Sequence, residues 1–169
     1  MSDQQLFRSA MSRLSAAVNV IATDGKGGRY GMTASAVCSV SDDPPMILIC
    51  VNRNARANAI FKTNGCLTVN ILAAGQSDIS ARFASSGLSV AERFGEMSDW
   101  FTLETGALLL RDALASLDCS VESVSEIATH SVFFCRVERF VLGELRDGLV
   151  YFDRNYRRTA TPIACESMT

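Results

Sequence analysis

The sequence is poor in the side chains from which most catalytic sites are built. It has one histidine, His130, among 169 residues, which excludes most histidine-rich metal sites. It lacks the GxSxG elbow of serine hydrolases, the HExxH zinc motif and the phosphate-binding loop GxxxxGK[ST]. The glycine-rich run 25–28 does not have the spacing of a dinucleotide fingerprint. An enzyme with so few reactive groups is expected to obtain its chemistry from a bound cofactor.

Long apolar runs and a strong charge of either sign are also absent. No run approaches the roughly 18–20 residues of a membrane span, and the polar segment 1–13 has no apolar stretch of the kind a secretory signal needs. The formal net charge of −2 gives no general attraction to nucleic acid or to an anionic membrane surface. We therefore expect a cytoplasmic protein without a nucleic-acid or membrane partner.

The six cysteines do not form a metal-binding pattern. They are Cys38, Cys50, Cys66, Cys119, Cys135 and Cys165. No two of them form a CxxC pair, and their spacings match no zinc template, so no metal site is expected. All except Cys165 lie inside apolar runs, where a free cysteine behaves as a small buried hydrophobic residue. We expect reduced core residues in a reducing compartment, or alternatively one cysteine that touches a bound ligand through its backbone.

The length fits one domain spanning residues 1–169. Ser2 and Gln5 have capping-box spacing and predict an N-terminal helix. Further helices are expected after Asn54 as N-cap, ending at Gly65, and over 76–84 and 90–94. Strands are expected over 17–22, 30–40, 46–51, 66–72, 113–124, 131–142 and 149–152, with 46–51 buried on both faces.

The order of these elements favours an antiparallel barrel. Several strands follow one another without a crossover helix, which argues against a doubly wound parallel sheet. A barrel this small leaves little interior space, so a large planar ligand would sit on the rim or between subunits.

Four segments, in this order along the chain, resemble the short flavin reductases that serve two-component flavin monooxygenases. They are Gly31–Pro45, Ile49–Ala55, Ala128–His130 and Gly148–Tyr156. The resemblance runs over nearly the whole chain. It implies a mainly β (α+β) fold, a split β-barrel of the FMN-binding flavin reductase type with short flanking helices, which forms a homodimer. It also implies an NAD(P)H:flavin oxidoreductase that passes a hydride from NADH or NADPH to FMN or FAD and supplies the reduced flavin to a partner oxygenase.

The same resemblance assigns the flavin to two segments. The isoalloxazine ring would lie along a strand of small residues, with two neighbours just downstream: Thr33, Ala34, Ser35, Ala36, Cys38 and Ser39. The flavin phosphate would lie where a strand meets a helix, because the first amides of a helix are unpaired and attract anions; the residues there are Asn52, Arg53, Asn54, Ala55 and Arg56. From the residues alone, an ordinary strand and a helix cap with solvated arginines stay open.

Three further places are implied by the family likeness. Arg82 and Phe83 would contact the flavin tail, although a core phenylalanine beside a surface arginine is the alternative. His130 would orient the nicotinamide as the catalytic residue; relatives carry glycine where this chain has Ala128, and alanine is strained if that position has positive φ. Arg154 and Tyr156 are candidates in the last segment, where relatives often have histidine in place of Arg157.

Two other functions stay open at this point. One is an FMN-bound reductase of another acceptor, such as a corrinoid or an iron complex. The other is a flavin-binding module without turnover.

Overall fold

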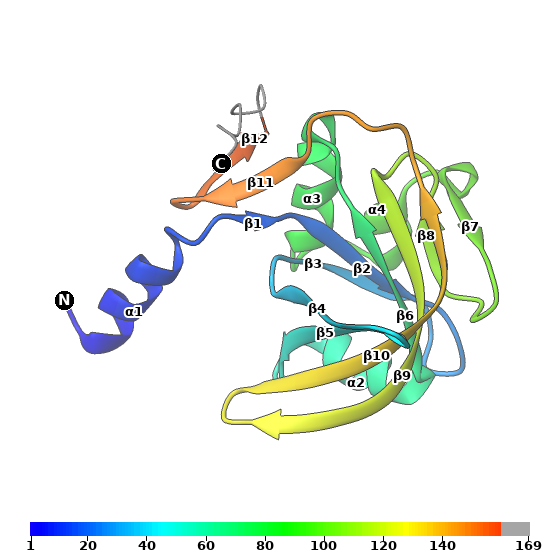
Figure 1. Ribbon diagram of the computed structural model, residues 1–169, viewed down its shortest axis with the longest axis horizontal. Helices are drawn as coiled ribbons and strands as arrows, with labels where there is room; N and C mark the ends of the chain where they lie inside the picture. Colours follow the sequence, from blue (N-terminus) through cyan, green and yellow to red (C-terminus); the bar gives the residue numbers. More distant parts are fainter. Residues whose placement is uncertain (160–169) are drawn as a thin grey trace, which may run out of the picture.

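The computed structural model describes residues 1–159, so Cys165 lies outside the described residues. A seven-stranded antiparallel sheet dominates the molecule (Figure 1). Its strands are β2 (Asn19–Thr23), β3 (Tyr30–Ala34), β4 (Val37–Asp42), β5 (Pro45–Asn52), β6 (Cys66–Ile71), β9 (Ala115–Ile127) and β10 (His130–Leu142), in the spatial order β3-β2-β6-β9-β10-β5-β4. The expected mainly β architecture is confirmed.

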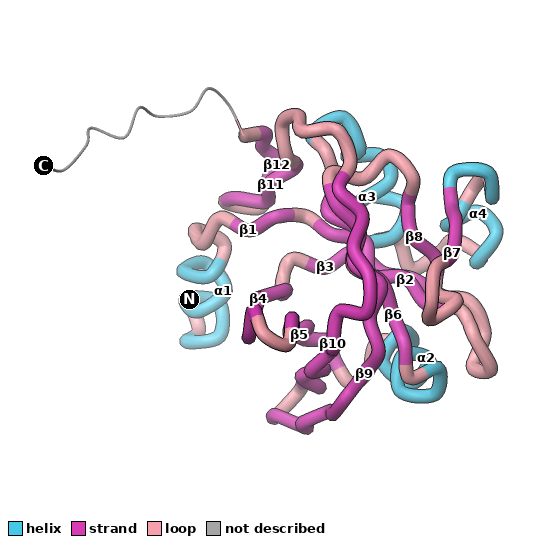
Figure 2. The backbone as a smooth tube through the Cα atoms, turned by 45° about the vertical axis from the view of Figure 1, so that its right-hand side comes forward, coloured by secondary structure: helices cyan, strands magenta, loops and turns pink. Residues whose placement is uncertain are grey.

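Shorter elements surround this sheet. The helices are α1 (Asp3–Met11), α2 (Arg56–Asn64), α3 (Ser77–Ala84) and α4 (Val90–Phe94), with 3-10 turns at Ala74–Gln76 and Met97–Asp99. The strands β1 (Ala16–Ala17), β11 (Leu149–Phe152) and β12 (Asn155–Arg158) form a second sheet, and β7 (Trp100–Thr102) pairs with β8 (Leu108–Leu110). Figure 2 shows α1 projecting to one side of the sheet and α4 lying at the opposite side. No helix within residues 1–159 is long and apolar enough to cross a membrane.

Sequence patterns located most of these elements. The capping box of Ser2 and Gln5 begins α1, and Gly65 ends α2 in the left-handed conformation with φ +67. The expected strands do not include β7, β8 and β12, each three or four residues long, and the expected strand 17–22 overlaps the two-residue β1 only at Ala17. Strands this short show too little alternation to stand out from loop sequence.

The expected single strand over 30–40 is wrong, because the chain forms two strands there. β3 ends at Ala34 on β2, and β4 begins at Val37 on β5, so the two strands lie at opposite ends of the sheet order. Ser35 and Ala36 bridge the gap, where the Cys50 amide donates to the Ala36 carbonyl at 3.1 Å. Residues 30–34 and 37–40 both have a strand pattern, so the sequence does not reveal the break between them. The break opens one side of the barrel.

β5 is buried on one face only, which corrects the expectation of two buried faces. Ile47, Ile49 and Val51 are buried, whereas the alternating Met46, Leu48 and Cys50 are half-buried. A strand in a one-layer antiparallel sheet has a single core face. The apolar run 46–51 is therefore unbroken because the outer face of β5 is apolar as well.

Two apolar clusters form the core. The first lies between the sheet and α2, where the rings of Phe61 and Phe133 meet edge to face at 6.1 Å. The second lies beneath α3 and α4, where Phe83 packs against Phe94 at 5.1 Å and against Trp100 at 5.6 Å. Strand β3 packs on the first cluster, which contains Ala34 and has Tyr30 and Met32 packed against it, so the rim that begins at Thr33 rests on a packed base.

The cysteines divide into three environments. Cys119 and Cys135 are buried, Cys50 and Cys66 are half-buried, and Cys38 is exposed, so the core expectation is wrong for Cys38. The five described cysteines are all free thiols. Burial raises the pKa of the Cys135 thiol to about 12 and raises the pKa of Cys119 as well.

The two longest strands are offset against their neighbours. β6 pairs with β9 only over residues 115–120, and β5 pairs with β10 only over residues 130–136. The turn between β9 and β10 therefore extends past β6 and is flanked by β5 and α2 (Figure 1).

Candidate functional site

The end of β3 forms one wall of a small cavity on the rim. Its volume is about 220 Å³, and its lining is Val18, Thr33, Ala34, Ser35, Ala84, Tyr151 and Tyr156. The Thr33 hydroxyl donates to the Ser80 carbonyl at 2.6 Å, and the Ser80 and Tyr156 hydroxyls hydrogen-bond at 2.8 Å. These bonds tie β3, α3 and the β11–β12 hairpin together. Small residues on one side and two tyrosine rings on the other suit a flat aromatic ligand.

A larger cavity of about 530 Å³ adjoins the first one and shares Thr33 and Ala84 with it. Its lining is Tyr30, Met32, Thr33, Asn54, Ala55, Arg56, Ala57, Phe83, Ala84, Ser85, Ser86, Leu88 and Arg93. Two cations face the Tyr30 ring: the Arg56 guanidinium carbon lies 5.2 Å from its centroid and that of Arg93 lies 5.0 Å away. The second cavity is thus the positively charged one.

Arg93 is a buried cation that shapes this cavity. It is 2% exposed and donates to the carbonyls of Phe83 and Ser85, both at 2.7 Å, and of Arg82 at 3.3 Å. The chain that leaves α3 is therefore wrapped around a guanidinium. The Nε atoms of Arg93 and Arg82 are buried without a hydrogen-bond partner within residues 1–159. An anionic group bound in the larger cavity fits the two positive charges of Arg56 and Arg93 beside Tyr30.

The strand-to-helix segment 52–56 divides into two parts. Asn54, Ala55 and Arg56 line the larger cavity, whereas Arg53 turns away and pairs with Glu126 at 3.0 Å. The prediction of Asn54 as the N-cap is wrong, because α2 begins after Ala55, which offers no side-chain acceptor. Instead the Asn54 amide donates to the Asn52 side chain at 2.9 Å, so an Asx turn precedes the helix.

The other predicted flavin contacts take different positions. Phe83 lines the larger cavity but is mainly a core residue of the second apolar cluster. Arg82 lies against Gly95 and outside both cavities; a side chain at Gly95 would overlap its guanidinium, with a Cβ only 2.5 Å from Nη1. Ala36, Cys38 and Ser39 continue along the exposed outer side of the sheet and line neither cavity.

His130 lies at the tip of the β9–β10 hairpin, outside both cavities. It is the first residue of β10, and it pairs with Asn52 of β5 and Ile127 of β9. Its Nδ1 atom lies 2.9 Å from the Thr129 hydroxyl, and its side chain is exposed. Ala128, in the turn, has φ +48, so the strain expected at this position is confirmed.

The last motif contributes one residue to the cavities. Tyr156 lines the smaller cavity, whereas Arg154 sits at the tip of its hairpin and donates to the Ser9 hydroxyl at 3.1 Å. Arg157 faces a separate cavity with Ser15 and Phe152. The structure therefore brings Tyr156 together with Thr33, but not Arg154.

Ten residues that line the two cavities were not predicted from the sequence: Val18, Tyr30, Met32, Ala57, Ala84, Ser85, Ser86, Leu88, Arg93 and Tyr151. Tyr30 directly precedes the Gly31–Pro45 segment, and its aromatic ring at a strand start was a usable signal. Arg93 had none, because a single arginine in a short amphipathic helix normally faces solvent. Residues 1–159 contain no group of three or more His, Cys, Asp or Glu side chains that could hold a metal ion.

Comparison with known sequences gives a consistent result. The family model described as a flavin reductase like domain matches residues 11–160. The chain is 47% identical over 163 residues to "FMN reductase (NADH) RutF" of Cronobacter turicensis, covering 96% of this chain and 97% of that protein. It is 45% identical over 159 residues to the 4-hydroxyphenylacetate 3-monooxygenase reductase component of Pseudomonas aeruginosa, covering 94% of each.

Solved structures share the fold. The flavin reductase component BorF of a bacterial two-component tryptophan halogenase superposes with a TM-score of 0.87 at 30% identity, covering 95% of this chain and all of that one, 100%. The NADH:FAD oxidoreductase of Streptomyces globisporus, solved in complex with NAD and FAD fragments, gives a TM-score of 0.86 at 29% identity and covers 96% of each chain.

Proposed function

Since this chain belongs to the flavin reductase-like domain family, we propose that it is an NADH:flavin oxidoreductase with FMN as its acceptor. The observation that carries this proposal is the pair of adjoining rim cavities, one aromatic and one cationic. A flavin mononucleotide has the same two parts, a flat ring and an anionic tail. The 47% identical relative named FMN reductase (NADH) supports the choice of flavin and of nicotinamide donor.

The two cavities divide the flavin between them. Thr33, Ala34 and Ser35 would hold one face of the ring, with Tyr156 on the other side of the cavity. The phosphate lies in the larger cavity, where Arg56 and the first amides of α2 supply positive charge. Arg93 holds the wall in shape and adds a second charge beside Tyr30.

The chemistry needs little from the protein beyond placement. The bound flavin supplies the ring that accepts a hydride, and the balanced reaction is NADH + FMN + H⁺ → NAD⁺ + FMNH₂. The protein would need to hold the nicotinamide and flavin rings in contact, at roughly 3–3.5 Å. His130 orients the nicotinamide. It need not supply the proton that the reaction consumes, because His130 is exposed and water can reach this part of the site.

A second copy of the chain completes the outer side of the site. Cys38 and Ser39 on β4 are exposed, as is Ala36 just before this strand. Helix α1 displays Leu6, Phe7 and Met11 to solvent, and Leu14 just after the helix is exposed as well. Several large apolar side chains exposed on one short segment are typical of a protein–protein interface. We therefore expect a homodimer, which light scattering on the purified protein will detect as twice the mass of one chain.

The reduced flavin passes to a partner oxygenase. Two relatives are named as reductase components of two-component systems, one with a monooxygenase and one with a halogenase. Both cavities open to the rim, which suits a flavin that is released after reduction.

Anaerobic stopped-flow absorbance tests the proposal directly. NADH mixed with enzyme and FMN should bleach the flavin in a fast single-turnover phase, with slower phases for FAD and for NADPH. Flavin that binds but stays oxidised would identify a flavin-binding module. Turnover that is slow with free flavin and fast with a corrinoid or ferric chelate would identify a reductase of another acceptor.

A further inference from the structure

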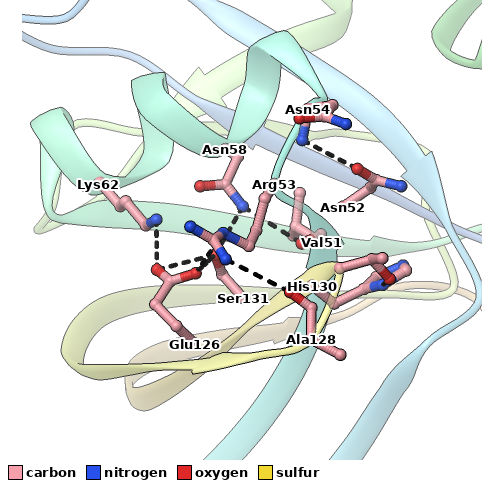
Figure 3. Close-up of polar contacts among 11 residues, drawn as sticks. Val51, Asn52, Arg53, Asn54, Asn58, Lys62, Glu126, Ala128, His130 and Ser131 are labelled. Carbon is pink, nitrogen blue, oxygen red and sulfur yellow. Dashed lines mark hydrogen bonds and ion pairs between the residues drawn. The ribbon is translucent and has the colours of Figure 1, made fainter.

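One carboxylate at the base of the β9–β10 turn makes contacts with three side chains. Glu126 Oε1 lies 2.6 Å from Lys62 Nζ, and its Oε2 lies 3.0 Å from Arg53 Nε. The Ser131 hydroxyl donates to both oxygens, at 3.1 and 2.9 Å (Figure 3). Glu126 thus joins α2, the end of β5 and both strands of the hairpin. These contacts lower the pKa of Glu126, with Lys62 the largest cause and Ser131 the next, so the carboxylate is charged at neutral pH.

The network continues into the core. Asn58 of α2 donates to the Ser131 hydroxyl at 2.9 Å and to the Val51 carbonyl at 3.2 Å. Asn58 is 3% exposed and Ser131 is 0% exposed. The Ser131 hydroxyl accepts from Asn58 and gives its only proton to Glu126, so the chain of bonds has one consistent direction. A buried, satisfied pair therefore fixes where Glu126 is anchored.

Arg53 extends from the carboxylate to the turn itself. Its Nη1 atom lies 3.4 Å from the Ala128 carbonyl, and its backbone amide donates to the Thr129 carbonyl at 3.0 Å. One residue therefore holds both carbonyls of the turn that precedes His130. Ala128 is held at φ +48, a conformation that a free alanine avoids. The strained turn needs such a restraint in order to persist.

We propose that Glu126 is a positioning residue for the nicotinamide donor. It fixes Arg53 and Ser131 on either side of the turn and so sets where the His130 ring is presented. This inference rests on the proposed function, in which His130 orients the nicotinamide. It also assigns Arg53 to the hairpin and removes it from the flavin phosphate.

A neighbouring ion pair separates this role from ordinary surface charge. Glu122 lies on the same strand and pairs with Arg136 of β10, but neither residue contacts the turn or Ser131. Exposed ion pairs contribute little to stability. A Glu→Gln change at either position should therefore leave the unfolding midpoint nearly unchanged, and only the Glu126 change should affect the donor.

The experiment compares Glu126→Gln with Glu122→Gln in steady-state NADH oxidation and in flavin titrations. We expect Glu126→Gln to raise the KM for NADH about fivefold, with kcat changed less than KM and the flavin Kd within about 1.5-fold of the unmodified protein. Glu122→Gln should leave all three constants unchanged. An equal rise in KM for both variants, or a flavin Kd that rises in step with KM, would overturn the inference.

A double-mutant cycle with His130→Ala tests whether Glu126 acts through the histidine. If it does, Glu126→Gln should raise the KM by less than about 1.5-fold once His130 is gone. The same fivefold rise in both backgrounds would refute positioning. A rise in KM for His130→Ala without any for Glu126→Gln sinks this inference alone, whereas an unchanged KM for His130→Ala refutes the nicotinamide placement on which it depends.

Arg53→Gln breaks the same contact from the opposite side and serves as the second variant. It should reproduce the KM effect of Glu126→Gln and leave flavin affinity unchanged. Thermal unfolding of every variant separates loss of fold from loss of placement. A fall in flavin affinity for Arg53→Gln would return this arginine to the phosphate site and contradict the assignment.

Discussion

The two sides of the proposed active site are held in place by different kinds of interaction. On the flavin side, the buried Arg93 binds three backbone carbonyls, and the Thr33, Ser80 and Tyr156 hydroxyls tie the cavity wall to two other elements. On the nicotinamide side, exposed ion pairs centred on Glu126 hold a strained turn, and a single buried pair, Ser131 with Asn58, anchors Glu126. Buried groups are costly to leave unpaired, whereas exposed charges exchange readily with water and salt. We therefore expect the flavin side to be rigid and the tip of the β9–β10 hairpin to be displaced more easily.

The largest effect is expected from Arg93→Met. The change leaves the carbonyls of Arg82, Phe83 and Ser85 without their donor, which should cost about 3 kcal/mol of unfolding free energy. At this chain length that lowers the melting temperature by roughly 6–12 °C.

Arg111→Met is the matched control for that variant, because Arg111 is exposed and donates to one carbonyl, that of Ser98. Differential scanning calorimetry should show a loss of less than about 1 kcal/mol for the control. If Arg93→Met melts with the control, the flavin side is not held by its buried cation.

Arg56→Ala should weaken flavin binding about tenfold, by removing a charge from the larger cavity. The loss should shrink as the salt concentration rises, because an ion pair with phosphate is screened. Flavin fluorescence titrations at two ionic strengths measure both effects. The comparison of the two sides fails if Arg53→Ala, on the hairpin side, weakens flavin binding as much.

Ala128→Gly should increase stability by about 1 kcal/mol, because glycine adopts φ +48 without steric cost. Ala59→Gly, on the exposed side of α2, should decrease it by a similar amount, since glycine is unfavourable inside a helix. Urea unfolding curves give both signs in one experiment. Destabilisation by both glycines would mean that the turn carries no relievable strain.

The mildest test is chemical labelling of the cysteines, which requires no substitution. At pH 8, iodoacetamide should modify exposed Cys38 first, whereas burial keeps Cys135, with its pKa raised to about 12, and Cys119 protonated and unreactive. Raising the pH toward 12 should bring Cys135 into reaction, because its thiolate is the nucleophile. Peptide mass spectrometry, with and without FMN, follows each thiol. Equal labelling of Cys38 and Cys135 at pH 8 would contradict this assignment of environments.

Local patterns in the sequence predicted local features of the site. The left-handed strain at Ala128 follows from one residue that replaces glycine, and the small residues at 33–35 do line a cavity. The orientation of Arg53 could not be predicted, because it depends on Glu126, which the hairpin brings close only after folding. The same holds for Arg93, whose acceptors lie on a different helix and turn.

The fold shows the same division between local and long-range information. Helix ends with a chemical signature, such as Ser2 with Gln5 and the left-handed Gly65, are found where the sequence places them. The break at Ser35 and Ala36 was missed, because it arises where one segment leaves β2 and joins β5 across the open side of the barrel. Pairing partners, not propensity, decide such a break.

Because β9 and β10 are offset against their neighbours, the turn that precedes His130 lies outside the region that β6 pairs with. Strand β6 grips the ribbon over residues 115–120, far from the turn, and β5 grips β10 from its first residue onward. We therefore expect substitutions at 128 and 129 to leave the register of the sheet intact. If the nicotinamide binds beside His130 as proposed, we expect changes in this turn to alter the KM for the nicotinamide donor and to leave flavin affinity unchanged.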